Sequence, residues 1–477
     1  MEDLLRMAIE LSQELGASYS EARFQSDSGA TFLLKNSSLE FIDFHVLAGI
    51  AIRVVVDGSL GFSSSNNLSR ASVRSAVESA VSFARSTTKL VKQPVLLSNE
   101  EFSEDVVEIR PRIRFENVEF GAAVELFKEA DSAIIEKAGK WGVKMASRIL
   151  RVDAGTCTKF IVNSEGAKVR SSIPRTMFSY TLIGVHPQKG SAMRQSALGE
   201  SRGWEAIERW DIVALMEEEG EAMGAVLEKG ISPPKENLDV LLGSEVVGLV
   251  CHESTGHPSE ADRILGREAA QAGESYLSAD SIGMEIGSTV IDVIDDPTIP
   301  GSYGFYIYDD EGVKAGKRYL IKEGKVAGFL HNRETAASFG TKSNGASRSL
   351  YYDKEPIVRM ANTYLEAGDM SFEELIEDIE KGVYVRNFTE WNIDDRRFNQ
   401  RYTGFEAYMI ENGELGTPVR NPTIEMTTTG LYRAVDAVGK DLRFYGATCG
   451  KGDPMQGIPV WTGGPTIRLR NVKLGGA

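Results

Sequence analysis

The stretch LDVLLGSEVVGLVCHESTGHPSEAD, residues 238–262, joins a predicted strand to a helix that carries potential metal ligands. Its first apolar residues indicate a buried strand, and we expect Ser244 to cap the helix that follows. His252, Glu253 and His257 then lie near the end of that helix. They form the pattern H-E-x-x-x-H, which is one residue longer than the H-E-x-x-H of many zinc peptidases.

The extra residue creates a geometric problem for a shared metal ion. Each residue of an α-helix turns by about 100°, so His252 and His257 would diverge by about 140°. A π-bulge, with its i→i+5 repeat, would bring the two positions over one another. Alternatively, the helix frays at Gly256 and His257 turns back from a non-helical backbone, which the following Pro258 favours. The alternative to any metal site is that both are ordinary surface or capping histidines.

A catalytic zinc ion needs a third protein ligand, with water at the fourth position. By residue type, the candidates are His45, His186, His331 and Cys449. Cys449 lies in the glycine-rich stretch YGATCGKGDPMQGIPVWTGGP, and a thiolate is a good zinc ligand. A small buried apolar side chain is the alternative role for Cys449, and a turn or surface residue is the alternative for His331.

The composition indicates a soluble globular protein of 477 residues, with 42% apolar and 26% charged residues. The chain has no apolar run long enough to span a bilayer. Its formal net charge of −16 argues against nucleic-acid binding and against an anionic membrane as partner. Three cysteines are too few for a disulfide framework, and the acidic N-terminus lacks the features of a signal peptide. We therefore expect a cytoplasmic protein.

The length of the chain predicts more than one domain. The stretch EKGISPPKENLD marks a boundary near residues 230–237, because the paired prolines stop the preceding helix. We expect a mixed N-terminal region at 1–230, which can divide into two blocks at 1–95 and 112–230. A strand-rich domain at 231–477 then carries the metal-site helix. The predicted fold class is α+β.

Local patterns predict individual elements of this fold. In the first half, TFLLKNSSLEFIDF predicts two strands around a polar turn at 35–38, and Asp57-Gly58 predicts a hairpin turn. Apolar periodicity predicts an N-terminal helix and three more, from Ser69, at 118–140 and at 212–228. Residues 147–202 predict strands, with turns at 153–155 and 164–166. In the second half, Ser371 and Glu374 form a capping box, and strands are predicted in TVIDVIDD, YIYDDEG, RYLIKEGKVAGFL, VYVRNF and YMIENGEL.

Several motifs together resemble the TldD branch of the TldD/PmbA family. They are HESTGH in the middle, ATCGKG near the end, GASYSEARF and RVVVDGSLGFSSSN near the start, and GASRSLYYDKEPIVRMANTYLEAGD at 345–369. The resemblance covers nearly the whole chain, with the motifs in the right order. It implies a zinc metalloprotease that acts on unfolded or unstructured peptides.

Carried onto this chain, the resemblance implies one zinc ion on His252, His257 and Cys449. It also implies that Glu253 is the general base for a zinc-activated water. The family motif HExxGHxxExD is matched here, with Pro258 at a variable position. The PmbA branch, also called TldE, lacks the metal motif and serves as a partner subunit. The resemblance therefore implies either a homodimer or a heterodimer with a PmbA/TldE-like paralogue.

Other roles remain open for several of these residues. Arg359 and Asn362, in VRMANTY, are candidate substrate-binding residues, and a structural turn network is the alternative for both. The chain could be a non-catalytic partner or scaffold subunit, or a cysteine hydrolase with Cys449 as nucleophile and a histidine base. The stretch CGKGDPMQG also has some character of a phosphate-binding loop, but no clear strand and helix flank it. Metal content, peptidase activity and sensitivity to chelators distinguish these functions.

Overall fold

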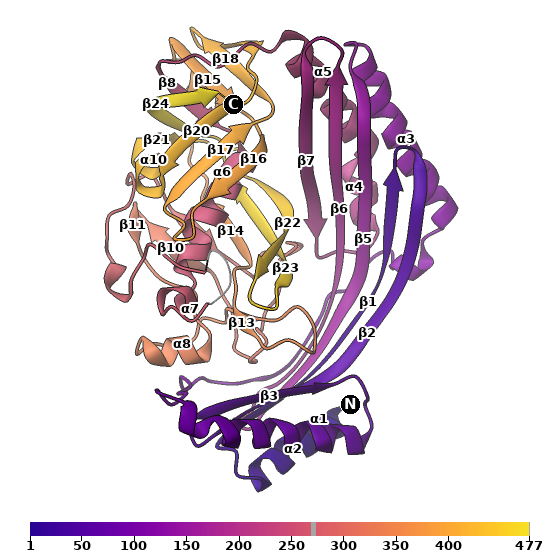
Figure 1. Cartoon of the computed structure of the whole chain (residues 1–477), viewed down its shortest axis with the longest axis vertical. Coiled ribbons are helices and arrows are strands. Elements are labelled where there is room, and N and C mark those ends of the chain that lie inside the picture. The colour runs from indigo at the N-terminus through magenta and orange to yellow at the C-terminus, as the bar shows by residue number, and fades with distance from the viewer. Residues whose placement is uncertain (269–272, 477) are drawn as a thin grey trace.

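The computed structural model describes residues 1–268 and 273–476, which form a mixed α+β fold (Figure 1). The predicted α+β class is confirmed. The first half of the chain builds one tall sheet with helices on one side, and the second half packs against the other side (Figure 1). Within the described residues, no helix combines the length and the apolar character needed to cross a membrane.

The tall sheet has seven strands in the order β3-β2-β1-β5-β6-β4, with β7 also paired to β6. The strands are β1 (Tyr19–Lys35), β2 (Ser38–Val56), β3 (Ser59–Ser65), β4 (Glu104–Glu108), β5 (Lys144–Asn163), β6 (Lys168–His186) and β7 (Gly190–Glu200). The turns predicted at 35–38, at Asp57-Gly58 and at 164–166 are confirmed. The turn predicted at 153–155 is wrong. Hydrogen bonds to β1 on one side and to β6 on the other keep β5 extended through this stretch.

Helices cover one face of this sheet in two groups. The helix α1 (Glu2–Glu14) and the helix α2 (Arg70–Thr87) share an apolar core with the lower parts of β1 and β2. The helices α3 (Phe120–Gly139) and α5 (Ile212–Lys229) pack on the upper parts of β1, β5 and β6, next to the short α4 (Glu205–Trp210). The helices predicted from sequence periodicity are thus confirmed, and Ser69 caps α2 by accepting a hydrogen bond from the Ser72 amide. Because side chains alternate along a strand, the opposite face turns toward the second half of the chain.

The second half contains two larger sheets and a two-stranded ribbon. The nine-stranded sheet has the order β16-β17-β20-β24-β8-β15-β18-β19, with β21 paired to β24, and the six-stranded sheet has the order β11-β10-β9-β14-β23-β22. The strands of the first are β8 (Asn237–Leu242), β15 (Lys381–Val385), β16 (Phe388–Ile393), β17 (Asn399–Gly404), β18 (Ala407–Glu411), β19 (Glu414–Pro418), β20 (Pro422–Thr427), β21 (Val435–Val438) and β24 (Ile467–Gly476). Those of the second are β9 (Val293–Asp295), β10 (Arg318–Lys322), β11 (Lys325–Val326), β14 (Asn362–Leu365), β22 (Arg443–Lys451) and β23 (Gln456–Gly464), and the ribbon joins β12 (Ser347–Arg348) to β13 (Ile357–Val358).

Short helices connect these strands, and one of them fills the core between the sheets. They are α6 (Ser244–Cys251), α7 (Ala261–Ile264), α8 (Arg333–Ser338), α9 (Phe372–Ile376) and α10 (Thr428–Ala434). Apolar residues of α6 belong to a core that includes strands of both larger sheets. The capping box of Ser371 and Glu374 at α9 is confirmed.

One predicted strand of this half is wrong. Residues 306–312, YIYDDEG, form a turn, although their aromatic and branched side chains favour extended backbone. The Asp309 carboxylate accepts hydrogen bonds from the amides of Glu311 and Val313, at 3.0 and 2.9 Å. This local capture of backbone donors competes with strand pairing.

Candidate metal centre

The helix α6 carries the H-E-x-x-x-H segment from the core into the site. Gly243, not the predicted Ser244, is its N-cap residue. Ser244 is already helical, and its hydroxyl donates a 3.3 Å hydrogen bond to the Asp441 carbonyl instead of capping the helix. Every residue of α6 is buried, so the histidines that follow extend from an element enclosed in the core.

The helix continues as a π-helical turn, η3 (His252–Gly256), at the point where the sequence required a distortion. Of the two distortions considered, the structure contains the π-bulge. The fraying does not occur, because His257 keeps helical angles (φ −59°, ψ −45°) and begins the 3₁₀ turn η4 (His257–Ser259). The i→i+5 repeat brings the rings of His252 and His257 together, with centroids 4.9 Å apart and planes at 79°.

Gly256 closes the π turn against Met360. A Cβ atom added at Gly256 would lie 1.9 Å from the Met360 sulfur, which is fully buried. We expect Gly256→Ala to overpack this contact and to lower the free energy of unfolding by about 1–3 kcal/mol. Urea unfolding measures the change, with Gly121→Ala in α3 as control, because nothing lies within 4 Å of a Cβ added there. Equal stability of both variants would show that Met360 does not constrain the turn.

Cys449 of β22 joins the two histidines from a distant part of the sequence. One ligand atom each of His252, His257 and Cys449 lies within 4.8 Å of the others, and all three side chains are buried. The Cys449 Sγ lies 3.4 Å from His257 Nε2. Within residues 1–268 and 273–476, this is the group of histidine, cysteine and acidic side chains whose geometry could hold a metal ion.

The surroundings of Cys449 and His252 favour the protonation states that bind metals. Burial raises the pKa of the Cys449 thiol, but the neighbouring His257 and Arg359 outweigh burial and lower it to about 7. Burial lowers the pKa of His252, which favours its neutral imidazole. A thiolate and a neutral imidazole are the forms that coordinate metal ions. The buried Nδ1 of His252 has no hydrogen-bond partner among the described residues.

Glu260 supports His257 from behind. Its Oε2 lies 2.9 Å from His257 Nδ1, accepts a 2.7 Å hydrogen bond from Arg263 Nε and lies 3.3 Å from Lys451 Nζ. Burial raises the pKa of Glu260, but Lys451, His257 and Arg263 outweigh it and hold this pKa well below its usual value. An ionised Glu260 favours the His257 tautomer with the proton on Nδ1, which leaves Nε2 to face Cys449. The sequence contains a signal for the role of Glu260, because it is a carboxylate three residues after the candidate ligand His257. The contact of Glu260 with Lys451 was not predicted.

Glu253 lies on the π turn between the two histidines and is 8% exposed. Burial raises its pKa, but His257 and Arg397 outweigh this effect and lower the pKa below its usual value. Arg397 donates a hydrogen bond to Glu253 Oε2 across 144 positions of sequence. The backbone of Arg397, between β16 and β17, has a positive φ of 63°, and its carbonyl accepts a hydrogen bond from Thr428. Sequence reasoning missed Arg397, because no spacing pattern connects it to Glu253.

The other candidate histidines lie elsewhere. His45 lies on β2, and His186 Nε2 lies 3.0 Å from a Glu228 carboxylate oxygen. His331 packs against Phe329 and Phe339, and burial lowers its pKa to about 4. The stretch CGKGDPMQG forms the end of the β22–β23 hairpin, so it lacks the strand-loop-helix arrangement of a phosphate loop.

Arg359 and Asn362 are completely buried. Arg359 donates hydrogen bonds to the carbonyls of Gln456 and Cys449, and so ties together the two strands of the β22–β23 hairpin. The side-chain amide of Asn362 uses both of its hydrogens and both lone pairs within the protein, with Asp296, Ser302, Gly304 and Trp461. These contacts favour structural roles, and direct contact of either residue with a substrate stays a prediction.

Comparison with known proteins gives consistent matches along the chain. Residues 20–84, 113–225 and 235–476 match family models described as PmbA/TldA metallopeptidase domain 1, central domain and C-terminal domain. A metalloprotease of Methanothermobacter thermautotrophicus is 32% identical over 96% of this chain and 95% of its own length. A zinc metalloprotease TldD homolog of Saccharolobus solfataricus is 32% identical over 52% of this chain and 54% of its own. The crystal structure of TldE from Thermococcus kodakarensis has the same fold, with a TM-score of 0.76, 19% identity, and coverage of 99% of this chain and 100% of that one.

Proposed function

Because this chain belongs to the TldD/PmbA family of metallopeptidases, we propose that it is a zinc-dependent peptidase that cleaves unfolded or unstructured peptides. The observation that carries the proposal is the convergence of His252, His257 and Cys449 within 4.8 Å, with Glu253 on the π turn between the two histidines. A non-catalytic PmbA-type partner subunit would have no need of this convergence.

The donor set fits one zinc ion. Two imidazole nitrogens and a thiolate are typical zinc ligands, and three protein ligands leave a fourth position for water or substrate, as in catalytic sites. The buried Nδ1 of His252 has no hydrogen-bond partner among the described residues. Because buried polar atoms rarely lack a partner, this also supports a group bound at the site. Glu260 supplies the carboxylate that commonly supports a ligand histidine.

The reaction then depends on how the surrounding side chains move protons. When bound, zinc supplies Lewis acidity, which polarises a carbonyl group and acidifies a water molecule. Glu253, held ionised by His257 and Arg397, accepts a proton from the attacking water and delivers it to the leaving amine. Arg397 orients the Glu253 carboxylate through its hydrogen bond to Oε2. Burial of these groups excludes bulk water and strengthens the electrostatic interactions among them.

The strand that carries Cys449 offers a way to hold peptides of varied sequence. β22 is the last strand of its sheet. An extended peptide can pair with the main chain of an edge strand without reading side chains, which suits an unstructured substrate. As assembly we propose either a homodimer or a heterodimer with a PmbA/TldE-like paralogue, and we propose the cytoplasm as its location.

Removal of the metal tests the proposed class of reaction. We expect the purified chain to contain about one zinc ion and to hydrolyse an unstructured peptide such as denatured casein. Dialysis against a chelator should abolish hydrolysis, and added zinc should restore it, because the Lewis acid is essential. Elemental analysis and a peptide-release assay measure both effects. Activity that survives the chelator would instead favour the cysteine hydrolase, for which the 3.4 Å contact of Cys449 with His257 would serve as the nucleophile pair.

A further inference from the structure

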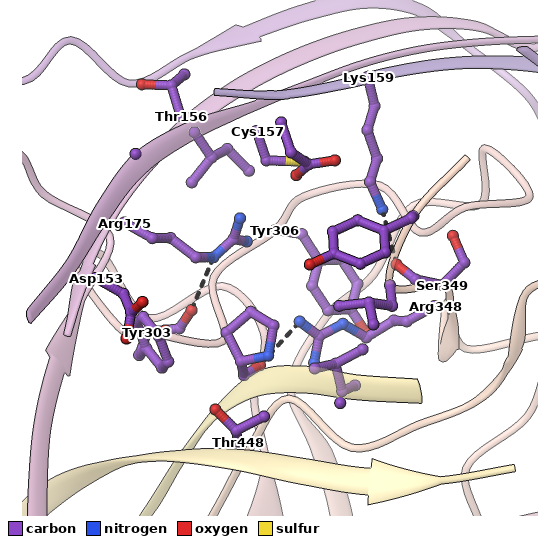
Figure 2. Close-up of a pocket in the computed structure, with 18 of the residues that line it drawn as sticks. Asp153, Thr156, Cys157, Lys159, Arg175, Tyr303, Tyr306, Arg348, Ser349 and Thr448 are labelled. Carbon is purple, nitrogen blue, oxygen red and sulfur yellow. Dashed lines mark hydrogen bonds between the residues drawn. The ribbon is translucent and has the colours of Figure 1, made fainter. Parts of the chain in front are cut away.

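A second candidate site lies between the tall sheet and the β22–β23 hairpin. The cavity there has a volume of about 400 Å³, within the size range of small-molecule sites (Figure 2). Its walls come from β1, β2 (through His45), β5 and β6 on one side and from the segments 303–310, 348–351 and 457–459 on the other. Thr448 also lines the cavity and is exposed, so solvent reaches the cavity.

Thr448 and Cys449 are consecutive residues of β22, so their side chains lie on opposite faces of the strand. The cavity is therefore separated from the candidate metal centre by the β22–β23 hairpin. None of the three candidate zinc ligands lines it.

The acidic side chains of this cavity already have partners. Arg151 donates two 2.7 Å hydrogen bonds to Asp153, and Lys159 donates two of the same length to Asp310. The Asp309 carboxylate accepts hydrogen bonds from backbone amides, including that of Ser347. Asp27 accepts a 2.7 Å hydrogen bond from Gln25, and burial raises the Asp27 pKa.

Two arginines in the cavity have no carboxylate among the described residues that balances their charge. Figure 2 shows Arg175, from β6, and Arg348, from β12, both extending into the cavity. Arg175 donates hydrogen bonds to the carbonyls of Tyr303 and Phe305, and Arg348 to those of Met360 and Pro459. Neither forms an ion pair with a carboxylate within the described part of the chain.

The charge of Arg348 is also costly in its surroundings. Its residue is 6% exposed. Burial, together with the like charges of Arg175 and Arg359, lowers the pKa of Arg348 to about 10. A buried guanidinium without a counterion is unfavourable unless an anion compensates it. The chain supplies carbonyl dipoles at this point, and a bound anion would supply the missing charge.

We propose that this cavity binds the carboxylate group of a small organic anion between Arg175 and Arg348, with the C-terminal carboxylate of a short peptide as its source. The guanidinium fork matches a planar carboxylate. The acidic side chains of Asp27, Asp153, Asp309 and Asp310 share the cavity, so a singly charged ligand meets less repulsion than a doubly charged phosphate. The peptide as source rests on the proposed peptidase function, whereas the carboxylate site itself does not.

Binding measured by calorimetry tests the site apart from catalysis. The protein is the full chain with Glu253→Gln, so that no peptide is consumed, and it is studied with and without a chelator. The probes are acetyl-dialanine with a free C-terminal carboxylate, the same peptide as its C-terminal amide, and inorganic phosphate. We expect the free acid to bind at least tenfold more tightly than the amide and more tightly than phosphate, with or without the chelator.

Variants then locate the bound carboxylate. Thr156→Asp adds a negative charge to the cavity wall without removing an arginine, and Arg348→Lys keeps the charge but removes the fork. We expect each to weaken binding of the free acid at least tenfold. Arg110→Gln, at an 82% exposed side chain outside the cavity, removes one positive charge and should leave binding unchanged.

Several outcomes would overturn the proposal. They are equal affinity for acid and amide, tighter binding of phosphate, or affinities that are unchanged in both cavity variants. Binding that disappears with the chelator would assign the peptide to the metal centre and would equally refute a separate site. A failure of peptide hydrolysis in the wild-type chain, with the binding pattern intact, would instead contradict only the proposed peptidase function.

Discussion

Replacing Glu253 with glutamine is expected to lower peptide hydrolysis at least about hundredfold, while the zinc content stays unchanged. Glutamine has nearly the same shape but cannot accept a proton from water at neutral pH. Glu253 is not one of the three proposed zinc ligands, so the metal should remain bound. The effect should fall on kcat more than on KM, because the proton is transferred in the transition state.

The comparison needs a control, because the substitution also leaves the buried Arg397 without its carboxylate partner. Glu285→Gln makes the same chemical change at an exposed side chain and should retain full activity. Thermal unfolding of both variants separates a loss of catalysis from a loss of fold. Full activity in a folded, zinc-loaded Glu253→Gln protein would exclude Glu253 as the general base.

Local sequence patterns predicted most elements of this fold but failed where side chains or partner strands decide the backbone. The turn signals at Asn36 and at Asp57-Gly58 were reliable, because these residues adopt positive φ at low cost. The similar signal at 153–155 was overruled by hydrogen-bonding partners on both sides of β5. The division of the chain into domains stays a prediction.

The candidate metal centre was also predictable from the sequence only in part. The spacing of His252 and His257 required a distorted helix, and the structure supplies a π turn that the sequence could not distinguish from fraying. No spacing rule connects Cys449 with His257, which is 192 positions away. Residue type made Cys449 one of four candidates for the third ligand, and the resemblance to a family then singled it out. Arg397 reaches Glu253 from the turn between β16 and β17, and only the tertiary fold brings that turn to the site.

Cys449→Ala is the second change with a large expected effect. It removes one of three proposed ligands, so we expect zinc affinity to fall by more than the 10–100-fold typical of losing a supporting residue, and peptide hydrolysis to fall with it. Zinc content after dialysis and competition with a metal indicator measure the loss. Unchanged zinc affinity would exclude Cys449 from the ligand set.

Cys251→Ala is a matched control, because Cys251 is also buried and lies directly before His252 in the sequence. Burial raises the pKa of the Cys251 thiol to about 12, so this thiol stays protonated and makes a poor ligand. The pKa of Cys449 is about 7, because His257 and Arg359 outweigh its burial. We therefore expect Cys449→Ala to lose zinc and Cys251→Ala to keep it.

The dependence of zinc affinity on pH also tests whether the Cys449 thiolate binds the metal. In the metal-free protein the Cys449 thiol becomes protonated as the pH falls below about 7, and a proton then competes with zinc. This one group should reduce the apparent affinity by about tenfold for each further unit of pH. The reduction should be steeper in the wild-type chain than in Cys449→Ala. Equal slopes would show that the thiol takes no part in binding the metal, whereas a cysteine hydrolase would lose activity in Cys449→Ala with no change in zinc.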